Sequence, residues 1–321
     1  MRTPLKLGSY AAGLAVIFAA AVGLGSVAGP STPTGATDST SHTNAGHDSA
    51  DVPQPGGPDV PAGLQIAQDG YRLQPISPAL AIGTPQPFAF RIIGPDGAPV
   101  TGYTKAHDKD LHLIVVRRDL SGFQHVHPTL GPAGTWSIPL AVPAAGQYRV
   151  FADFQPAGRE QGLTLGVDVP APGDYRPRVL PAAARTATVD GYTVTLAGDL
   201  VPGSSSKLTL SIAKDTKPVT DLQPYLGAYG HLVALRDGDL AYLHVHPDGV
   251  PGDGRTDAGP RVTFFAEVPS DGSYRLYLDF QHAGKVRTAE FTAVAGTPTA
   301  VPGTASPSAS AGHGATDHTH E

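Results

Sequence analysis

The chain has 321 residues, a net charge of −6 with neutral histidines, 13 histidines, one methionine and no cysteine. The lack of cysteine excludes disulfides, thiolate catalysis and zinc ribbons, and the near absence of methionine excludes the soft ligands that favour Cu(I). The net negative charge and the scattered Lys and Arg argue against nucleic acid as a partner. With 39 glycines and 32 prolines, the composition is rich in loops and favours an all-β fold.

Residues 1–29 have the pattern of an export signal. Arg2 and Lys6 precede a run of uncharged residues, 7–29, that is dominated by Ala, Gly, Val and Leu. Small residues at 26–28 resemble a signal-peptide cleavage site, which would release a soluble protein. A run of this length also spans a bilayer, so a membrane anchor stays open as the alternative. Both alternatives predict an extracytoplasmic protein, secreted or anchored to the cytoplasmic membrane.

Two segments have too few large apolar side chains to fold. Residues 30–62 consist largely of Pro, Gly, Ser, Thr and Asp and predict a disordered linker, and residues 296–321 predict a disordered tail. Both contain histidines, namely His42, His47, His313, His318 and His320. These histidines could capture metal loosely, or they could be part of a solvated linker.

One pattern occurs twice between these segments. It consists of Pro-Val-Thr, then a single histidine, then His-Val-His-Pro, and the second copy follows the first by 119 positions. The spacing of 13 residues from the single histidine to the next is the same in both copies. The duplication predicts two related modules, 63–170 and 185–295, joined by a linker at 171–184.

Short apolar runs alternate with turn clusters within each module, as is typical of antiparallel sandwiches. We expect strands at 71–74, 88–93, 111–117, 123–127, 135–140, 147–154 and 163–169 in the first module, and at 192–197, 207–212, 231–236, 241–246, 262–267, 273–280 and 287–294 in the second. Seven strands each predict two tandem immunoglobulin-like β-sandwiches. Tyr148 and Tyr274 each follow a glycine turn and resemble a tyrosine corner.

The dipeptide Asp237-Gly238 predicts a two-residue hairpin turn in the second module. In that register Arg236 faces Asp239 and Val233 faces Tyr242. Continuing the pairing along the two strands makes His231 face His244. Because side chains alternate along a strand, His246 emerges on the same face as His244. Three imidazoles would therefore converge.

The same spacing of His112, His125 and His127 predicts an equivalent cluster in the first module. The proline after the last histidine of each copy should end strand pairing, which would place that imidazole at the rim of the sheet. Each module is therefore predicted to contain a three-histidine metal site. A network of packing and hydrogen-bonding histidines is the alternative.

Three further residues are candidate ligands. Asp153 and Asp279 lie in otherwise apolar strands, where an unpaired carboxylate would be costly to bury. Each could be a fourth ligand, an acceptor that orients a histidine, or the partner of an arginine. His282 stands where the first module has Pro156, so it could add a nitrogen to the second site. The full set of candidate metal ligands is His112, His125, His127, Asp153, His231, His244, His246, Asp279 and His282.

Imidazole and carboxylate ligands suit Cu(II) or Zn(II), and the sequence does not separate these ions. Nucleophile, Walker and Rossmann motifs are absent from the sequence, so we expect no enzyme. The predicted function is extracytoplasmic metal binding for carriage, buffering or sensing. The alternative is a structural or adhesive envelope protein whose histidines serve packing.

The export segment, the small β modules and the His-Val-His-Pro motifs together resemble extracytoplasmic metal-associated proteins of the YtkA-like group and, more distantly, CopC-like copper carriers. The Cys-free composition, biased toward Ala, Pro and Val, resembles that of exported actinobacterial proteins. This resemblance covers about residues 64–295 and implies an immunoglobulin-like sandwich that handles copper or another heavy metal. The chain departs from CopC because it lacks a Met-rich Cu(I) site.

Overall fold

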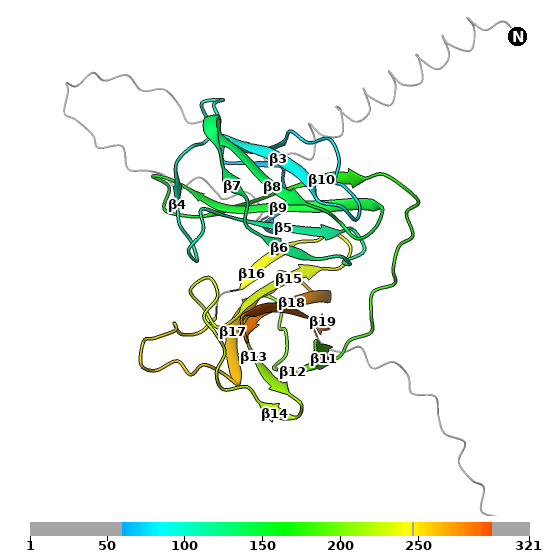
Figure 1. The fold of residues 1–321 in the computed structure, drawn as a ribbon, viewed down its shortest axis with the longest axis vertical. Coiled ribbons are helices and arrows are strands. Elements are labelled where there is room, and N and C mark those ends of the chain that lie inside the picture. Colours follow the sequence, from blue (N-terminus) through cyan, green and yellow to red (C-terminus); the bar gives the residue numbers. More distant parts are fainter. Residues whose placement is uncertain (1–59, 246, 297–321) are drawn as a thin grey trace, which may run out of the picture. The chain divides into compact units, whose positions relative to one another are not determined.

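The structure is a computed structural model that describes residues 60–245 and 247–296 (Figure 1). The predicted export segment, most of the spacer and nearly all of the C-terminal tail lie outside the described residues. In the part that is described, no helix combines the length and apolar character needed to cross a bilayer.

The first module is a sandwich of two antiparallel sheets (Figure 1). One sheet has the order β1 (Ala67–Gln68), β2 (Tyr71–Pro75), β3 (Gln86–Ile93), β8 (Thr135–Leu140) and β7 (Thr129–Leu130), with a 3-10 turn at Pro132–Gly134 before β8. The other has the order β10 (Leu163–Ala171), β9 (Gly146–Pro156), β5 (Leu111–Arg117) and β6 (Gln124–Val126), and β4 (Tyr103–Thr104) pairs with β9.

The second module repeats this arrangement. One sheet has the order β11 (Thr186–Val189), β12 (Tyr192–Ala197), β13 (Ser205–Lys214) and β14 (Lys217–Pro218), and β17 (Arg261–Glu267) also pairs with β13. The other has the order β16 (Tyr242–Val245), β15 (His231–Arg236), β18 (Gly272–His282) and β19 (Lys285–Ala295). The predicted all-β fold with two immunoglobulin-like modules is confirmed.

Each sandwich has its own apolar core, with Trp136 buried in the first and Phe264 in the second. The predicted tyrosine corners are present. Tyr148 donates from its hydroxyl to the Ala144 carbonyl at 2.8 Å, and Tyr274 donates to the Ser270 carbonyl at 3.0 Å. These two hydrogen bonds satisfy hydroxyls that would otherwise be costly to bury.

The predicted two-residue turn at Asp237-Gly238 is wrong. Val233 pairs with His244 and not with Tyr242, so the register is shifted by two residues from the predicted one. His231 therefore does not face His244. The carboxylate of Asp239 accepts from the Arg236 side chain and from a backbone amide, so Asp239 belongs to a longer turn. A shift of two residues leaves every side chain on its predicted face.

The two sandwiches pack against each other through a third apolar cluster, the interface cluster, whose residues come from both modules. Its fully buried members are Ile114, Val116, Leu120, Phe151, Val233, Leu235, Leu240, Tyr242 and Tyr277. Ile114 and Val116 alternate along β5 with residues of the first core, so β5 is buried on both faces. Their repeat equivalents Val233 and Leu235 lie in the same cluster.

Aromatic pairs show that this interface is pseudo-symmetric. Phe123 stacks on Tyr277 with ring centroids 3.9 Å apart, and Tyr242 packs on Phe151 at 5.1 Å. Phe123 and Tyr242 are equivalent in the two copies, as are Phe151 and Tyr277. Each module therefore presents the same patch to the other, as in an isologous two-fold dimer.

The chain enters the first sandwich between two of these rings. The Ala62 carbonyl accepts from the Tyr242 amide at 3.0 Å, and the Gly63 amide donates to the Thr164 carbonyl at 3.0 Å. Gly63 has a φ of +75°, and a Cβ there would lie 2.6 Å from the Phe151 ring and 2.9 Å from the Cβ of Tyr242. Only glycine fits this passage without displacing an aromatic side chain.

We predict that Gly63→Ala lowers the free energy of unfolding by about 1 to 3 kcal/mol more than Gly83→Ala does, because overpacking a tight site adds a cost of that size. Gly83 is the matched control, since it has the same φ of +75° and a Cβ added there would meet no atom within 4 Å. Urea denaturation of the three proteins measures the difference. Equal destabilisation would show that the passage between Phe151 and Tyr242 is not tightly packed.

Candidate metal centre

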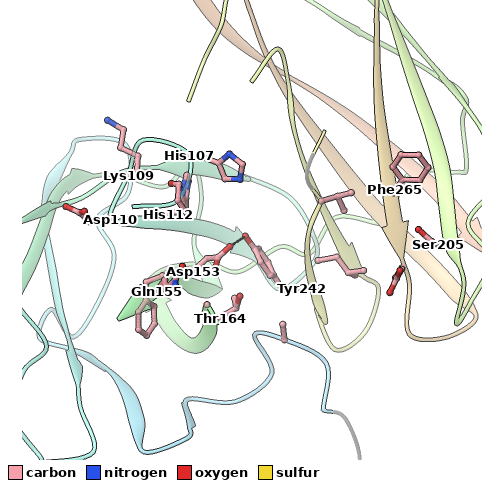
Figure 2. Close-up of a pocket in the computed structure, with 17 residues that line it drawn as sticks. His107, Lys109, Asp110, His112, Asp153, Gln155, Thr164, Ser205, Tyr242 and Phe265 are labelled. Atoms are coloured by element: carbon pink, nitrogen blue, oxygen red, sulfur yellow. Dashed lines mark hydrogen bonds between the residues drawn. The ribbon is translucent and has the colours of Figure 1, made fainter. Parts of the chain in front are cut away.

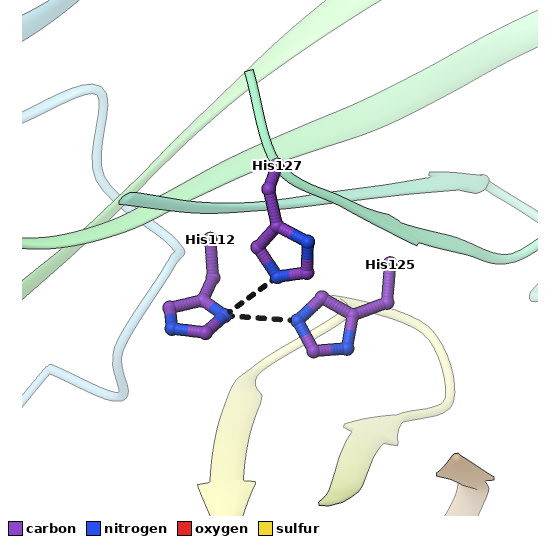
Figure 3. Close-up of side chains that lie close together, drawn as sticks. All are labelled: His112, His125 and His127. Carbon is purple, nitrogen blue, oxygen red and sulfur yellow. Dashed lines mark hydrogen bonds between the residues drawn. The ribbon is translucent and has the colours of Figure 1, made fainter. Parts of the chain in front are cut away.

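Three histidines of the first module converge at the end of β5 and β6, and we call them the histidine triad: His112, His125 and His127. One nitrogen from each lies within 4.8 Å of the other two (Figure 3). Nδ1 of His112 is 3.0 Å from Nε2 of His125 and 3.1 Å from Nε2 of His127. The sequence prediction that these three imidazoles meet is thus matched by the geometry, while their role as metal ligands stays a prediction.

Local structure explains the convergence. His112 shares a face of β5 with Ile114, and Ile114 pairs with His125 across β5 and β6. Strand β6 ends at Val126, so His127 follows the last paired residue, and after Pro128 the chain enters β7 in the opposite sheet. Proline has no amide to donate, which agrees with the predicted end of pairing at this point.

Hydrogen bonds on the outer side of the triad set the tautomer of His112. Its Nε2 lies 2.9 Å from the Ala106 carbonyl oxygen. A carbonyl only accepts, so Nε2 carries the proton, and in the neutral ring Nδ1 has a lone pair that points at the other two histidines.

The tautomer of His125 is set from the other module. Its Nδ1 lies 2.8 Å from Oδ2 of Asp279, and the two side chains are only 1% and 6% exposed. With Asp279 ionised and the His125 ring neutral, Nδ1 of His125 donates and its Nε2 has a lone pair. That nitrogen lies 3.0 Å from Nδ1 of His112. A metal ion or a proton placed between these two nitrogens would be bound by both.

His127 is held neutral. Burial is the largest cause that lowers its pKa from 6.5 to about 2, and the neighbouring His125, His112, Lys109 and His231 contribute to the same shift. A neutral imidazole is the form that ligates a metal ion. Proton competition at this ligand is therefore weak over the physiological range.

Further rings surround the triad, and two of them come from the second module. His231 lies with its ring centroid 6.1 Å from that of His125, and Tyr225 lies 6.4 Å from His127. His107 is 6.1 Å from His112 and 5.3 Å from His231. Sequence reasoning missed His107 because its repeat equivalent is Leu226, although its position five residues before His112 was a signal.

The second module reproduces part of this arrangement. His231 is 1% exposed, and its Nε2 donates to the Tyr225 carbonyl at 2.8 Å, just as His112 donates to Ala106 in the first module. Residue His246 and the side chain of His244 lie outside the described residues. The predicted second cluster therefore stays a prediction.

The two candidate aspartates contact the opposite module. Asp279 accepts from His125 with one oxygen and from the Thr288 hydroxyl with the other, at 2.6 Å. Asp153 accepts from the Tyr242 hydroxyl at 3.2 Å. Of the three roles that the sequence left open for these residues, orientation of a histidine describes the contact that Asp279 makes.

His282 has partners that do not belong to the triad. Its Nδ1 lies 2.6 Å from the Tyr192 hydroxyl and its Nε2 lies 3.0 Å from Asp221. Both ring nitrogens are thus within hydrogen-bonding distance of polar groups of the second sandwich.

A cavity of about 600 Å³ adjoins the triad, with walls from both modules. Figure 2 shows His107 and His112 on one side of it, Asp153 and Tyr242 pointing toward each other in the middle, and Phe265 on the far side. Burial raises the pKa of Tyr242 well above 10, and the Asp153 carboxylate adds to the effect. Its phenol is therefore a hydrogen-bond donor and not an anionic ligand.

Two of the separations within the triad are close to those expected around a first-row divalent ion. Zn–N bonds of about 2.0 to 2.1 Å at a tetrahedral angle put ligand nitrogens about 3.3 Å apart. The separations of 3.0 and 3.1 Å from the His112 nitrogen are close to that value. The outer hydrogen bonds of His112 and His125 are of the kind that orient metal-bound histidines.

Solved structures show distant likenesses. A titin fragment, A168–A169, is 10% identical with a TM-score of 0.18, covering 71% of this chain and 98% of that one. The bacterial integrin-binding protein invasin is 14% identical with a TM-score of 0.19, and the match covers 70% of this chain and 39% of invasin. A putative membrane-anchored protein of Corynebacterium diphtheriae is 10% identical with a TM-score of 0.21, and the match covers 72% of this chain and 60% of that protein. At such values these likenesses carry no argument about function.

A search of curated proteins gave no match. These comparisons do not support the expected relationship to YtkA-like or CopC-like proteins. A family model described as a domain of unknown function, DUF8832, matches residues 66–171 and again residues 187–297, which together are more than half of the chain. The two matched segments are the two sandwiches, and the chain therefore belongs to the DUF8832 family, with two copies of its domain.

Proposed function

We propose that this protein binds a divalent transition-metal ion, Cu(II) or Zn(II), at the histidine triad. The observation that carries the proposal is that Nδ1 of His112 lies 3.0 Å from Nε2 of His125 and 3.1 Å from Nε2 of His127, while the Ala106 carbonyl and Asp279 engage the outer nitrogens of His112 and His125. An ion at this point would be bound by three imidazole nitrogens. Binding in this way suits carriage, buffering or sensing of metal, and we propose no catalytic step.

The export signal at the N-terminus supports an extracytoplasmic location for this activity. Arg2 and Lys6 followed by 23 uncharged residues match either a cleaved signal or an anchor. Outside the cytoplasm an ion would meet the triad without competition from cytosolic thiols.

One observation favours a second candidate function, in which the histidines are structural. The contact between His125 and Asp279 joins the two sandwiches and is almost fully buried. If a proton and not a metal ion lies between His112 and His125, the same residues would form a charged hydrogen-bond network that holds an envelope protein rigid. The two functions differ in what an added ion does.

We predict that replacing His125 and His127 together by Ala abolishes submillimolar binding of Cu(II) and Zn(II), because two of the three ligands are lost. Isothermal titration calorimetry of the full chain at pH 7.5 measures the binding. Zn(II) at 100 times its dissociation constant should also stabilise the unmodified protein by about 2.7 kcal/mol.

Gln124→Ala is the matched control on the same strand, because Gln124 donates to the Ala141 carbonyl and takes no part in the triad. It should bind the ion as tightly as the unmodified protein. If the unmodified protein binds neither ion and the double variant only loses stability, the structural function is correct.

We predict that the metal-free protein loses stability as the pH falls from 7.5 to 4.5. The folded state holds His127 neutral with a pKa of about 2, whereas the unfolded chain protonates it near 6.5, so acid favours unfolding below about pH 6.5. Thermal unfolding in a chelator measures the trend. In His127→Gln the midpoint should fall less over this range; an equal fall would show that His127 titrates normally.

A further inference from the structure

We infer that ion binding and the docking of the two sandwiches are thermodynamically linked. The bound ion stabilises the docked arrangement, and docking completes the site that binds the ion. This inference rests on the proposed function. It adds a regulatory property to the triad, because anything that separates the modules would release the ion.

The triad and its surroundings come from both modules. All three triad histidines belong to the first module, but the carboxylate that orients His125 is Asp279 on β18 of the second module. The Thr288 hydroxyl fixes the other oxygen of Asp279, so this acceptor is positioned by its own sandwich. Separation of the modules would let His125 take the other tautomer, and loss of such an outer partner typically weakens metal binding 10- to 100-fold.

The apolar surface between the modules holds Asp279 in place. The interface cluster lies on the same faces of β5 and β15 as His112 and His231, so the apolar contact and the triad share one interface. Tyr277, two residues before Asp279, stacks on Phe123 and donates to the Leu120 carbonyl at 2.7 Å. Docking of this patch therefore brings Asp279 to His125.

Ion binding and docking of the modules must influence each other equally. If docking tightens ion binding by a given factor, ion binding must favour docking by the same factor, because both are changes in one thermodynamic cycle. Docking brings Asp279 to Nδ1 of His125, which leaves Nε2 of His125 as the nitrogen that can bind an ion beside His112. The bound ion should therefore favour the docked arrangement.

Two variants of the full chain test the linkage with Zn(II) as the probe. Asp279→Asn keeps the size of the side chain but removes the charge that orients His125. Leu235→Asp places a carboxylate in the interface cluster, away from the triad and outside the core of its own sandwich. We expect each variant to bind Zn(II) 10- to 100-fold more weakly by calorimetry at pH 7.5.

Asp190→Asn and Val294→Asp are the matched controls. Asp190 pairs with Lys285 on the surface of the second sandwich, and Val294 is 49% exposed on β19, so both residues lie outside the triad and the interface cluster. Both controls should bind Zn(II) as the unmodified protein does.

The docking itself is measured with spin labels. Because the chain has no cysteine, Ile76→Cys and Val201→Cys provide one exposed label on each module. Zn(II) should narrow the distance distribution between the labels, most clearly in the Leu235→Asp background.

The outcomes separate the two proposals. If the unmodified protein binds Zn(II), and both Asp279→Asn and Leu235→Asp bind it equally well, the linkage is overturned while the metal function stands. If the unmodified protein binds neither Zn(II) nor Cu(II), both proposals fall. Weaker binding in the two variants, with unchanged binding in the two controls, supports the linkage.

Discussion

The buried contact between His125 and Asp279 is the interaction on which the arrangement of the site depends. It joins two modules that are 154 residues apart in sequence at these positions, and both side chains are almost completely withdrawn from water. A carboxylate so placed is costly to bury unless a partner donates to it. The requirement for a partner makes Nδ1 of His125 the donor, and in the neutral ring the nitrogen that faces His112 then has a lone pair.

The duplication explains how such a site arises at an interface. Each copy has one sheet with an outward apolar patch, and two copies of one patch satisfy each other around a local two-fold axis. The copies have diverged, because His107 corresponds to Leu226 even though both residues take a positive φ, 49° and 52°. The surroundings of the two histidine sets are therefore not identical.

Much of the fold was predictable from the sequence because strand period and turn residues are local signals. The ranges of β5, β8, β12 and β15 agree with the expected ones to the residue. The turn after Arg236 was not predictable, because the Asp239 carboxylate competes with the strand for a backbone amide. The convergence of His112, His125 and His127 followed from spacing alone, since a register shift of two residues does not change the face of a side chain.

What local patterns could not give is the partner of each aspartate. An acidic residue in an apolar strand signals that a donor must exist, but not that the donor lies in the other module. That information resides in the packing of the two sandwiches, which depends on the summed burial of Ile114, Val233 and their neighbours rather than on any motif. The orientation of the three histidines therefore depends on the docked pair, because the triad lies in one module and the Asp279 carboxylate that holds His125 lies in the other.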